Sequence, residues 1–457
     1  MEPDLRALHA VFTAFSQKIV ADPQTAFDAL LFSVPHSSFS VLHGADSVRF
    51  LCVSAPLPGH LDWGGYLRTA AALAGRGHEV LWVSGADVAD AVQAAGVPFQ
   101  TVPTVGWQLP PPLPADLPAA AREQQRQCRA IAGWLEPEAV CQGVDALQAA
   151  AAEFRPDVIL SELFVTAAPI VAEQTGAPLV ICGWPAQVTP PPQSATPAQA
   201  VLHEARRRLA LIWMTTGVSG RYWPDANSFW PLSPYRHIVY FSPRWYSAGS
   251  PLLAQTVCVG GKAEATTHPG AAEVADVNAT EAALPAHRPL ILVTLGSLFT
   301  DDIAFFVNVT HAAAELGAHS VVACGRSVLA PGLLERLRQR QLPHVTLLDW
   351  VDYAWLLPRV ALVVHHGGMG TTHAAICHGL PQLIIPHAGD QALQGRRAAA
   401  AGVGLHLAPA QAGLAPLKAA LTDLLHNSIW RQRAAALQAE FAALGGSDRA
   451  AAILSGS

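Results

Sequence analysis

Two series of short apolar segments, with helical stretches between them, constrain the fold of this chain more than any other feature. The first series runs from Val48 to Trp184 and the second from Arg288 to Leu407. Segments that are apolar along their whole length are typical of parallel strands that helices cover on both faces. The sequence therefore predicts an α/β protein with two Rossmann-like, doubly wound parallel-sheet domains.

A chain of 457 residues fits two such domains of about 200 residues each. Between the two series the periodicity is lost in a stretch rich in Ala, Thr, Gly and Pro, which predicts a linker. The residues before the first series predict an amphipathic helix that packs on the first domain. The predicted division is an N-terminal extension (residues 1–46), a first domain (47–260), a linker (261–287), a second domain (288–429) and C-terminal helices (430–457).

The composition argues against several classes of protein. Hydrophobic residues make up 51% of the chain and charged residues 14%, which suffices for two cores and argues against disorder. The net charge of -6, without a basic stripe, argues against a nucleic-acid partner. Seven scattered cysteines without a CxxC pair indicate reduced thiols. No apolar stretch reaches the length of about 20 residues that a bilayer requires. We therefore expect a cytoplasmic monomer or homodimer without stable membrane insertion.

A glycine-rich turn in the second series carries the strongest chemical signal. The strand predicted over Ala361–Val364 is followed by two histidines and two glycines, and a helix begins near Gly370. Glycine lets a backbone approach a ligand closely, and a helix N-terminus offers unpaired N–H groups and the positive end of its dipole. His366, just before the turn, is in place to reach a phosphate oxygen. These residues indicate a diphosphate site.

The turn is part of a longer pattern that resembles family 1 of the glycosyltransferases, which have the GT-B fold, and especially its bacterial macrolide and antibiotic-type members. The matching residues, in order, are Trp350, His366, Gly367, Gly368, Gly370, Thr371, Pro386, Asp390 and Gln391. The resemblance covers roughly residues 47–440. It implies two Rossmann-like domains that face a central cleft, the first for the acceptor and the second for a nucleotide-sugar.

The resemblance also implies a role for each matching residue. Trp350 and Val351 border the base of the nucleotide. Asp390 and Gln391 hydrogen-bond the sugar hydroxyls, a task that suits a carboxylate beside an amide. The diphosphate is held by residues of the glycine-rich turn and by one residue after the first strand of the second domain: His366, Gly367, Gly368, Gly370, Thr371 and Ser297.

One departure from the family pattern concerns the ribose. Many members that use UDP-glucose have a glutamate for the ribose hydroxyls, and this chain has Ala374 at that position. A deoxyribose lacks the 2′-hydroxyl and has less need of that carboxylate. The donor is therefore expected to be a UDP-sugar or a dTDP-sugar.

The first domain is expected to hold the acceptor and the general base. A Gly-His pair follows the first strand in the family, and Gly59 and His60 match it. Imidazole titrates near neutral pH and suits proton abstraction. An acidic residue on a neighbouring loop holds this base in the family, and Glu162 stands at that position. The alternatives are a surface histidine without a role and a glutamate that caps the next segment. Trp63 replaces the proline that usually follows three residues after the histidine.

Together these residues imply a single inverting displacement that transfers a hexosyl group. His60 takes the proton from an acceptor hydroxyl while the oxygen attacks the anomeric carbon, and the diphosphate leaves towards His366 and the helix N-terminus. The chain has no Asp-x-Asp triplet of the kind that metal-dependent transferases use, so we expect no metal or other cofactor. Aromatic residues of the first domain indicate a small apolar acceptor, such as a natural product or a lipid: Trp63, Trp107, Trp184 and Trp213.

Other functions fit parts of the sequence. A nicotinamide dehydrogenase needs a G-x-G-x-x-G turn after its first strand, and the chain lacks that turn. His373 and Cys377 have a spacing that can hold zinc, but no second ligand pair accompanies them. A nucleotide-sugar epimerase or hydrolase on the same architecture, and a non-catalytic homologue that serves as an accessory protein, stay as alternatives.

The end of the chain is predicted to be helical. Apolar positions between Trp430 and Leu454 give this segment one apolar side. In the family the last helix crosses back onto the first domain, and the resemblance implies the same course here.

Overall fold

The computed structural model describes residues 47–110, 125, 128–189, 197–247, 249–263, 284–297, 301–325, 332–387 and 390–456. The predicted N-terminal extension and its amphipathic helix lie outside the described residues. So does most of the predicted linker.

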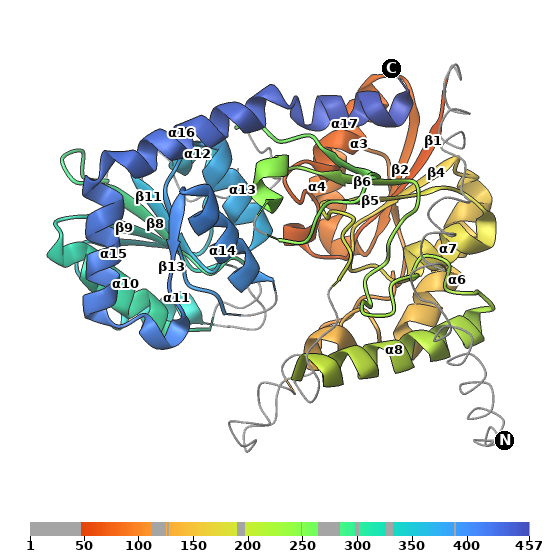
Figure 1. Ribbon diagram of the computed structural model, residues 1–457, viewed down its shortest axis with the longest axis horizontal. Coiled ribbons are helices and arrows are strands. Elements are labelled where there is room, and N and C mark those ends of the chain that lie inside the picture. Colours follow the sequence, from red (N-terminus) through yellow and green to blue (C-terminus); the bar gives the residue numbers. More distant parts are fainter. Residues whose placement is uncertain are drawn as a thin grey trace.

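The first sheet contains seven described strands, all parallel, in the order β3-β2-β1-β4-β5-β6-β7 (Figure 1). The strands are β1 (Arg49–Val53), β2 (Glu79–Ser84), β3 (Phe99–Thr101), β4 (Val158–Ser161), β5 (Leu179–Cys182), β6 (Arg236–Val239) and β7 (Thr256–Cys258). Their helices are α3 (Tyr66–Gly75), α4 (Ala89–Ala94), α6 (Pro137–Phe154), α7 (Ala167–Thr175) and α8 (Pro197–Thr216).

Alternate residues of the central strands enter two separate cores, one on each face of this sheet. Leu51 and Val53 of β1 pack with α6, α7 and α8, whereas Phe50 and Cys52 pack with α3 and α4. Successive side chains of a strand point to opposite faces, so a strand that is apolar throughout needs a helical layer on both sides.

The second sheet contains six described strands, also all parallel, in the order β10-β9-β8-β11-β12-β13. The strands are β8 (Leu290–Thr294), β9 (His319–Ala323), β10 (Val345–Leu348), β11 (Leu362–His365), β12 (Gln382–Ile384) and β13 (Gly404–His406). The helices that follow are α10 (Ile303–Glu315), α11 (Leu333–Arg338), α12 (Tyr353–Leu356), α13 (Met369–Cys377), α14 (Gln391–Ala401) and α15 (Leu414–His426). The predicted α/β architecture of two doubly wound parallel-sheet domains is confirmed.

Each sheet reverses its strand order at its centre. In the first sheet β1 lies between β2 and β4, and in the second sheet β8 lies between β9 and β11. Loops at the carboxyl ends of such strands diverge and leave a crevice in which open α/β sheets bind their ligands. The four loops at these two reversal points carry predicted site residues: His60 after β1, Glu162 after β4, Ser297 after β8 and His366 after β11.

The two C-terminal helices connect the domains. Helix α16 (Ser428–Ala443) packs on α13 of the second domain, whereas α17 (Gly446–Ser455) packs on α3 of the first (Figure 1). The chain between them is tied to the end of β7, because the Gly446 N–H donates to the Val259 carbonyl at 2.7 Å. The last helix thus lies on the first domain.

The domains meet through a buried core of their own. The ring of Phe241, from the first domain, lies 5.6 Å from Phe441 and 5.4 Å from His373 of the second domain, centroid to centroid. Gly64 and Gly261 of the first domain also face His373, and a Cβ on either glycine would overlap its ring. The contact is close enough that it depends on glycine at both positions.

The candidate zinc pair, His373 and Cys377, lies inside this interdomain core. The Cys377 sulfur is 3.6 Å from Nε2 of His373, and both side chains are buried. Within the part of the chain that the structure describes, no three His, Cys, Asp or Glu side chains gather in a way that could hold a metal ion. The pair therefore packs the interface between the domains.

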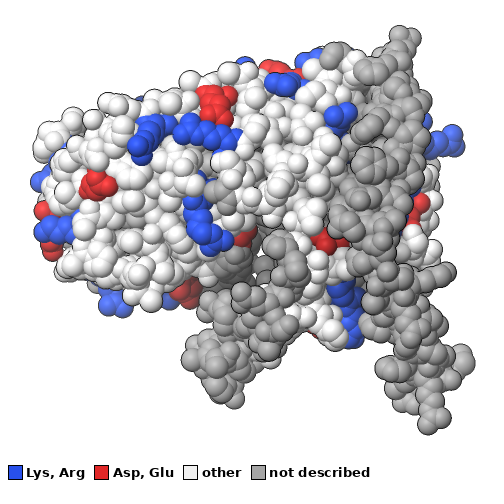
Figure 2. Space-filling model, viewed as in Figure 1, with Lys and Arg blue, Asp and Glu red and all other residues white. Residues whose placement is uncertain are grey.

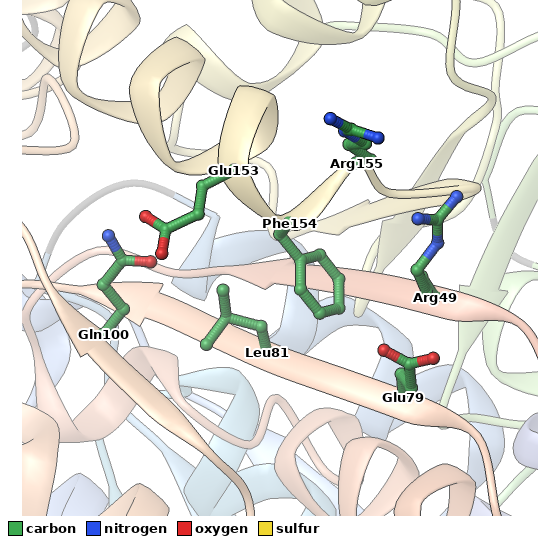
Figure 3. Close-up of a pocket in the computed structure, with 7 residues that line it drawn as sticks. All are labelled: Arg49, Glu79, Leu81, Gln100, Glu153, Phe154 and Arg155. Atoms are coloured by element: carbon green, nitrogen blue, oxygen red, sulfur yellow. The ribbon is translucent and has the colours of Figure 1, made fainter.

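A depression of about 550 Å³ lies on the first sheet, away from the reversal points (Figure 3). Its lining comes from the first three strands and from the end of α6: Arg49, Glu79, Leu81, Gln100, Glu153, Phe154 and Arg155. Arg49 and Glu79 begin β1 and β2. The depression therefore lies towards the amino ends of the strands, opposite the edge that carries the predicted site residues.

The face of the protein in Figure 2 carries few charged side chains. Where its described residues are visible, basic and acidic side chains are interspersed among uncharged ones. No helix among the described residues is both long enough and apolar enough to cross a bilayer.

Buried histidines make the stability of this fold dependent on pH. Burial lowers the pKa of His237 and His365 to about 4, and that of His366 and His373 to about 3. Because the unfolded chain binds protons at these positions below about pH 6.5, the stability that they contribute is complete above that pH and is lost as the pH falls. Below about pH 6.5, each of these four histidines should lower the free energy of unfolding by up to about 1.4 kcal/mol for every pH unit of acidification.

We predict that the melting temperature falls as the pH is lowered from about 7 to about 5. His373→Gln should flatten this dependence, whereas His203→Ala, on the exposed part of α8, should leave it unchanged. A melting temperature that stays constant or rises on acidification would contradict the assignment of neutral buried histidines.

Candidate active site

His60 and Glu162 meet between the two central strands of the first sheet. His60 ends a short 3₁₀ turn (Pro58–His60) after β1, and Glu162 directly follows β4. Nδ1 of His60 lies 3.3 Å from Oε1 of Glu162. The His60 side chain is 13% exposed and that of Glu162 is fully buried. The structure therefore brings together the two residues that the sequence identified as a base and its partner.

The Glu162 carboxylate is held by the backbone on both sides. Oε1 accepts a hydrogen bond from the Ala55 N–H at 3.0 Å, and Oε2 accepts one from the Phe164 N–H at 2.9 Å. The second bond is the capping contact that the sequence offered as an alternative role. Glu162 makes this contact and the one to His60 at the same time. Two N–H donors stabilise a buried carboxylate and fix its orientation.

The carboxylate also determines which nitrogen of His60 carries the proton. An ionised carboxylate only accepts hydrogen bonds, so Nδ1 of the neutral ring donates to it. Nε2 then keeps its lone pair and can accept a proton. The arrangement suits a general base whose ring is held by a neighbouring acid.

Aromatic rings surround His60 on one side. Its ring lies 4.8 Å from Trp63, 5.3 Å from Phe164 and 6.4 Å from Trp107, centroid to centroid. Phe164 extends this aromatic group, because its ring also contacts Trp134, Trp184 and Trp230 at 4.9 to 6.1 Å. A hydroxyl placed near His60 would therefore belong to a molecule that lies against an aromatic wall.

Trp63 owes its position in this wall to an unusual backbone conformation. Its φ is +46°, in the left-handed region that costs a non-glycine residue roughly 1–2 kcal/mol. Proline, whose φ is fixed at about −65°, could not adopt this conformation. The ring stacks on Phe164, and a Cβ on Gly183 would overlap it. Trp63, which stands where the family usually has proline, thus belongs to a loop that directs its indole ring towards His60.

The predicted aromatic residues of the acceptor surface lie in two places. Trp213, on α8, packs against Trp223 and over Gly220, whereas Trp63, Trp107 and Trp184 contact His60 or Phe164. Conversely, Phe164 and Trp134 belong to the aromatic wall and were absent from the predicted site. The place of Phe164, two residues after Glu162, was the sequence signal that could have identified it.

The glycine-rich turn follows β11 as predicted, and α13 begins at Met369. The Gly367 N–H donates to Nδ1 of His365 at 3.1 Å, and Gly367 has a φ of +91°. Nε2 of His365 therefore carries the proton and donates to Oε1 of Gln382 at 2.9 Å. Gly370 lies in the first turn of α13, and a Cβ there would meet no atom within 4 Å. The helix N-terminus is open, as a phosphate site requires.

His366 lies between two glycines at the base of this turn. A Cβ on Gly296 or on Gly368 would overlap its ring, so both loops depend on glycine to make room for it. Burial, together with His365 and His387, lowers the pKa of His366 to about 3. At neutral pH the ring is uncharged, and its single N–H donates to the Thr294 backbone, which ties the glycine-rich turn to the end of β8.

The remaining predicted nucleotide residues surround the same edge of the second sheet. Thr371 is buried in α13, with its hydroxyl 3.1 Å from that of Tyr353. Val351 is buried in the core beside β8, and Trp350, next to it, is half-buried. Ser297 is exposed after β8.

The loops of the two domains approach each other at Ser297. A Cβ on Gly59 would lie 3.2 Å from Oγ of Ser297. Gly59 is adjacent to His60, so the candidate base and the candidate diphosphate site lie on facing loops. A larger residue at position 59 would press against the second domain.

Asp390 and Gln391 begin α14 on the side that faces the first domain. Burial raises the pKa of Asp390, and Gln394, Arg397 and His60 act in the opposite direction. His60 is therefore near enough to Asp390 for their charges to interact. Oε1 of Gln391 accepts a hydrogen bond from the His387 N–H at 2.7 Å.

His387 and Asp302 form a further hydrogen-bonded pair beside these residues. Nε2 of His387 lies 3.0 Å from Oδ2 of Asp302, which also caps α10 through the Phe305 N–H. His387 holds the pKa of Asp302 below its usual range. The sequence analysis missed this pair, because its members are far apart in the chain and follow no motif.

The comparisons with known proteins agree with this geometry. Residues 332–451 match the family described as erythromycin biosynthesis protein CIII-like, C-terminal domain. Elloramycin glycosyltransferase of Streptomyces olivaceus is 30% identical over 377 residues, which cover 79% of this chain and 86% of that protein.

Solved structures of glycosyltransferases superpose on this chain. The glycotransferase of kitacinnamycin superposes with a TM-score of 0.65 at 25% identity, over 89% of this chain and 98% of that one. Spinosyn rhamnosyltransferase in complex with thymidine diphosphate has the same fold, with a TM-score of 0.60 at 20% identity over 88% and 98% of the two chains. The chain therefore belongs to family 1 of the glycosyltransferases and is a nucleotide-sugar-dependent glycosyltransferase of the GT-B fold.

Proposed function

We propose that this glycosyltransferase moves a hexosyl group from a dTDP- or UDP-sugar to a hydroxyl of a small apolar natural product by a single inverting displacement. The observation that carries the proposal is the position of the His60–Glu162 pair. It opens on one side to an aromatic wall and on the other, through Gly59 and Ser297, to the loops of the diphosphate site. A base, an acceptor surface and a donor surface thus lie within one small region.

In the proposed reaction, Nε2 of His60 takes the proton of the acceptor hydroxyl. The acceptor oxygen forms a bond to the anomeric carbon on the face opposite the diphosphate, and the bond from that carbon to the diphosphate oxygen breaks. Glu162 stabilises the imidazolium that results, since its carboxylate is fixed 3.3 Å from Nδ1. The anomeric carbon ends with inverted configuration because only one displacement takes place.

The diphosphate leaves as an anion towards α13. The N-terminal N–H groups of α13 and the positive end of its dipole face that charge, and His366 packs against Gly368, the N-cap residue of this helix. These groups supply the stabilisation that the reaction needs from this chain, so we propose that it proceeds without a metal ion.

The donor sugar is proposed to bind to Asp390 and Gln391. A carboxylate such as that of Asp390 accepts hydrogen bonds from sugar hydroxyls, and an amide such as that of Gln391 suits the same task. Burial has raised the pKa of Asp390, so hydroxyl donors would stabilise its ionised form. Ala374 and the thymidine diphosphate bound by the spinosyn rhamnosyltransferase both favour a dTDP-sugar.

The acceptor is proposed to lie against the aromatic wall of the first domain. The rings that make up this surface are Trp63, Trp107, Trp134, Phe164, Trp184 and Trp230. Flat aromatic surfaces bind fused-ring or macrocyclic molecules well. The elloramycin glycosyltransferase and the spinosyn rhamnosyltransferase, which is also known with the spinosyn aglycone, are named for natural products.

The first prediction concerns the donor. Nucleoside diphosphates should raise the melting temperature, because a ligand at a hundred times its dissociation constant adds about 2.7 kcal/mol of stability. We expect a shift with dTDP or UDP and with the matching nucleotide-sugar, and we expect EDTA to leave it unchanged. NAD and NADP serve as controls. The proposed donor site is wrong if only a dinucleotide shifts the curve or if none of these ligands does.

The second prediction concerns the base. His60→Ala should lower kcat by roughly 10²–10⁴-fold, the range of general base catalysis. Glu162→Gln should also lower kcat, because an amide cannot accept all three hydrogen bonds or balance the imidazolium charge. Nucleoside diphosphate affinity, measured by calorimetry, should not change in either variant. His203→Ala is the control. A His60→Ala enzyme that retains wild-type kcat would contradict this role.

A further inference from the structure

The Asp390 carboxylate is oriented by a hydrogen-bond chain that starts in the other domain. Nε1 of Trp245 donates to Oε1 of Gln394 at 3.0 Å, and Nε2 of Gln394 donates to Oδ2 of Asp390 at 3.1 Å. Trp245 belongs to η5 (Pro243–Tyr246), a short 3₁₀ helix of the first domain, whereas Asp390 and Gln394 lie at the start of α14 in the second.

The direction of this chain is fixed by its first member. An indole N–H can only donate, so the amide oxygen of Gln394 must face Trp245. The Gln394 NH₂ group then faces Asp390, which accepts with Oδ2 and leaves Oδ1 outside the chain. Without the indole N–H, the buried Gln394 oxygen would lose its donor, and the Gln394 side chain would be held on one side only, by Asp390.

Burial makes the loss of either hydrogen bond costly. Trp245 and Gln394 are each 1% exposed, and buried polar groups of this kind are costly to leave without a partner. Trp245 also stacks on Phe241 at 5.4 Å in the interdomain core. Its neighbour Tyr246 lies under the guanidinium of Arg397, also on α14, at 4.5 Å. Helix α14 therefore rests on η5 at several points.

We propose that Trp245 is a positioning residue for the donor sugar. Through Gln394 it holds the Asp390 carboxylate in the orientation that accepts sugar hydroxyls, so recognition of the sugar depends on the docking of the first domain onto α14. The inference rests on the proposed function, in which Asp390 contacts the sugar and the diphosphate binds elsewhere, at α13.

This role affects the affinity for the nucleotide-sugar but not the affinity for the nucleoside diphosphate. A nucleoside diphosphate does not reach Asp390, whereas the nucleotide-sugar does. The ratio of the dissociation constant of the nucleoside diphosphate to that of its nucleotide-sugar therefore measures what Asp390 contributes. Trp245→Phe keeps an aromatic ring in the core but removes the N–H. Gln394→Glu keeps an acceptor for Trp245 but removes the donor to Asp390.

The experiment is calorimetry with dTDP and dTDP-glucose, and with UDP and UDP-glucose, on the full chain. Trp245→Phe and Gln394→Glu should each lower the affinity ratio by about fivefold, as expected from the loss of one ordinary hydrogen bond. Nucleoside diphosphate affinity should stay the same. Asp390→Asn should lower the ratio as well. Trp430→Phe is the matched control, since its indole N–H bonds Asp423 on α15, away from the site.

The outcomes separate this inference from the proposed function. If Asp390→Asn lowers the ratio but Trp245→Phe and Gln394→Glu do not, Trp245 has no positioning role and the donor site stands. If these two variants weaken both ligands equally, they act only on the interface, which also overturns the inference. If Asp390→Asn leaves the ratio unchanged, or if no nucleoside diphosphate binds, the proposed donor site is wrong and the inference with it.

Discussion

The aromatic rings of Phe241 and Trp245 pack against His373, Phe441 and residues of α14. This contact sets the distance between two half-sites, one on each domain. In the proposed function each half-site alone is incomplete: the first domain supplies a base and an apolar wall, and the second supplies a turn for the diphosphate and polar groups for a sugar. Close packing leaves little freedom to vary their distance, because interfaces that resemble domain cores resist deformation. The C-terminal helices, which lie on both domains, reinforce the same arrangement.

Both half-sites follow from one property of doubly wound sheets. Where the strand order reverses, neighbouring loops diverge at the carboxyl ends of the strands, and this happens between β1 and β4 and again between β8 and β11. The chemistry at these points relies on groups that are neutral or internally paired. His366 is uncharged at neutral pH, the Glu162 carboxylate accepts two backbone hydrogen bonds, and in the proposed function the dipole of α13 takes the place of a cationic side chain. Binding of a diphosphate therefore brings the main new charge into a prepared polar environment, the condition under which such groups are most effective.

Much of this organisation could be predicted from the sequence, because it depends on local patterns. Apolar segments identified the strands, and the turn at Gly367 was found where the sequence predicts a phosphate site, a role that stays a prediction. The resemblance to the family identified His60 and Glu162, which the fold then brought together. Side-chain contacts between distant segments could not be predicted. The Trp245–Gln394 bond joins residues 149 positions apart, and the His387–Asp302 pair joins residues 85 apart. Trp213 is a related case: composition indicated an aromatic surface but could not show that this ring packs against Trp223.

The configuration of the product tests the account most directly. A base on the first domain that faces the donor across the interdomain contact allows one displacement, with attack opposite the leaving diphosphate. The measurement is the coupling constant of the anomeric proton, by NMR, in the glycoside formed from an α-configured nucleotide-sugar. The account predicts a β-glycoside. An α-glycoside would contradict it, because retention requires a second displacement or an attack from the face of the leaving group, and the position of His60 serves neither.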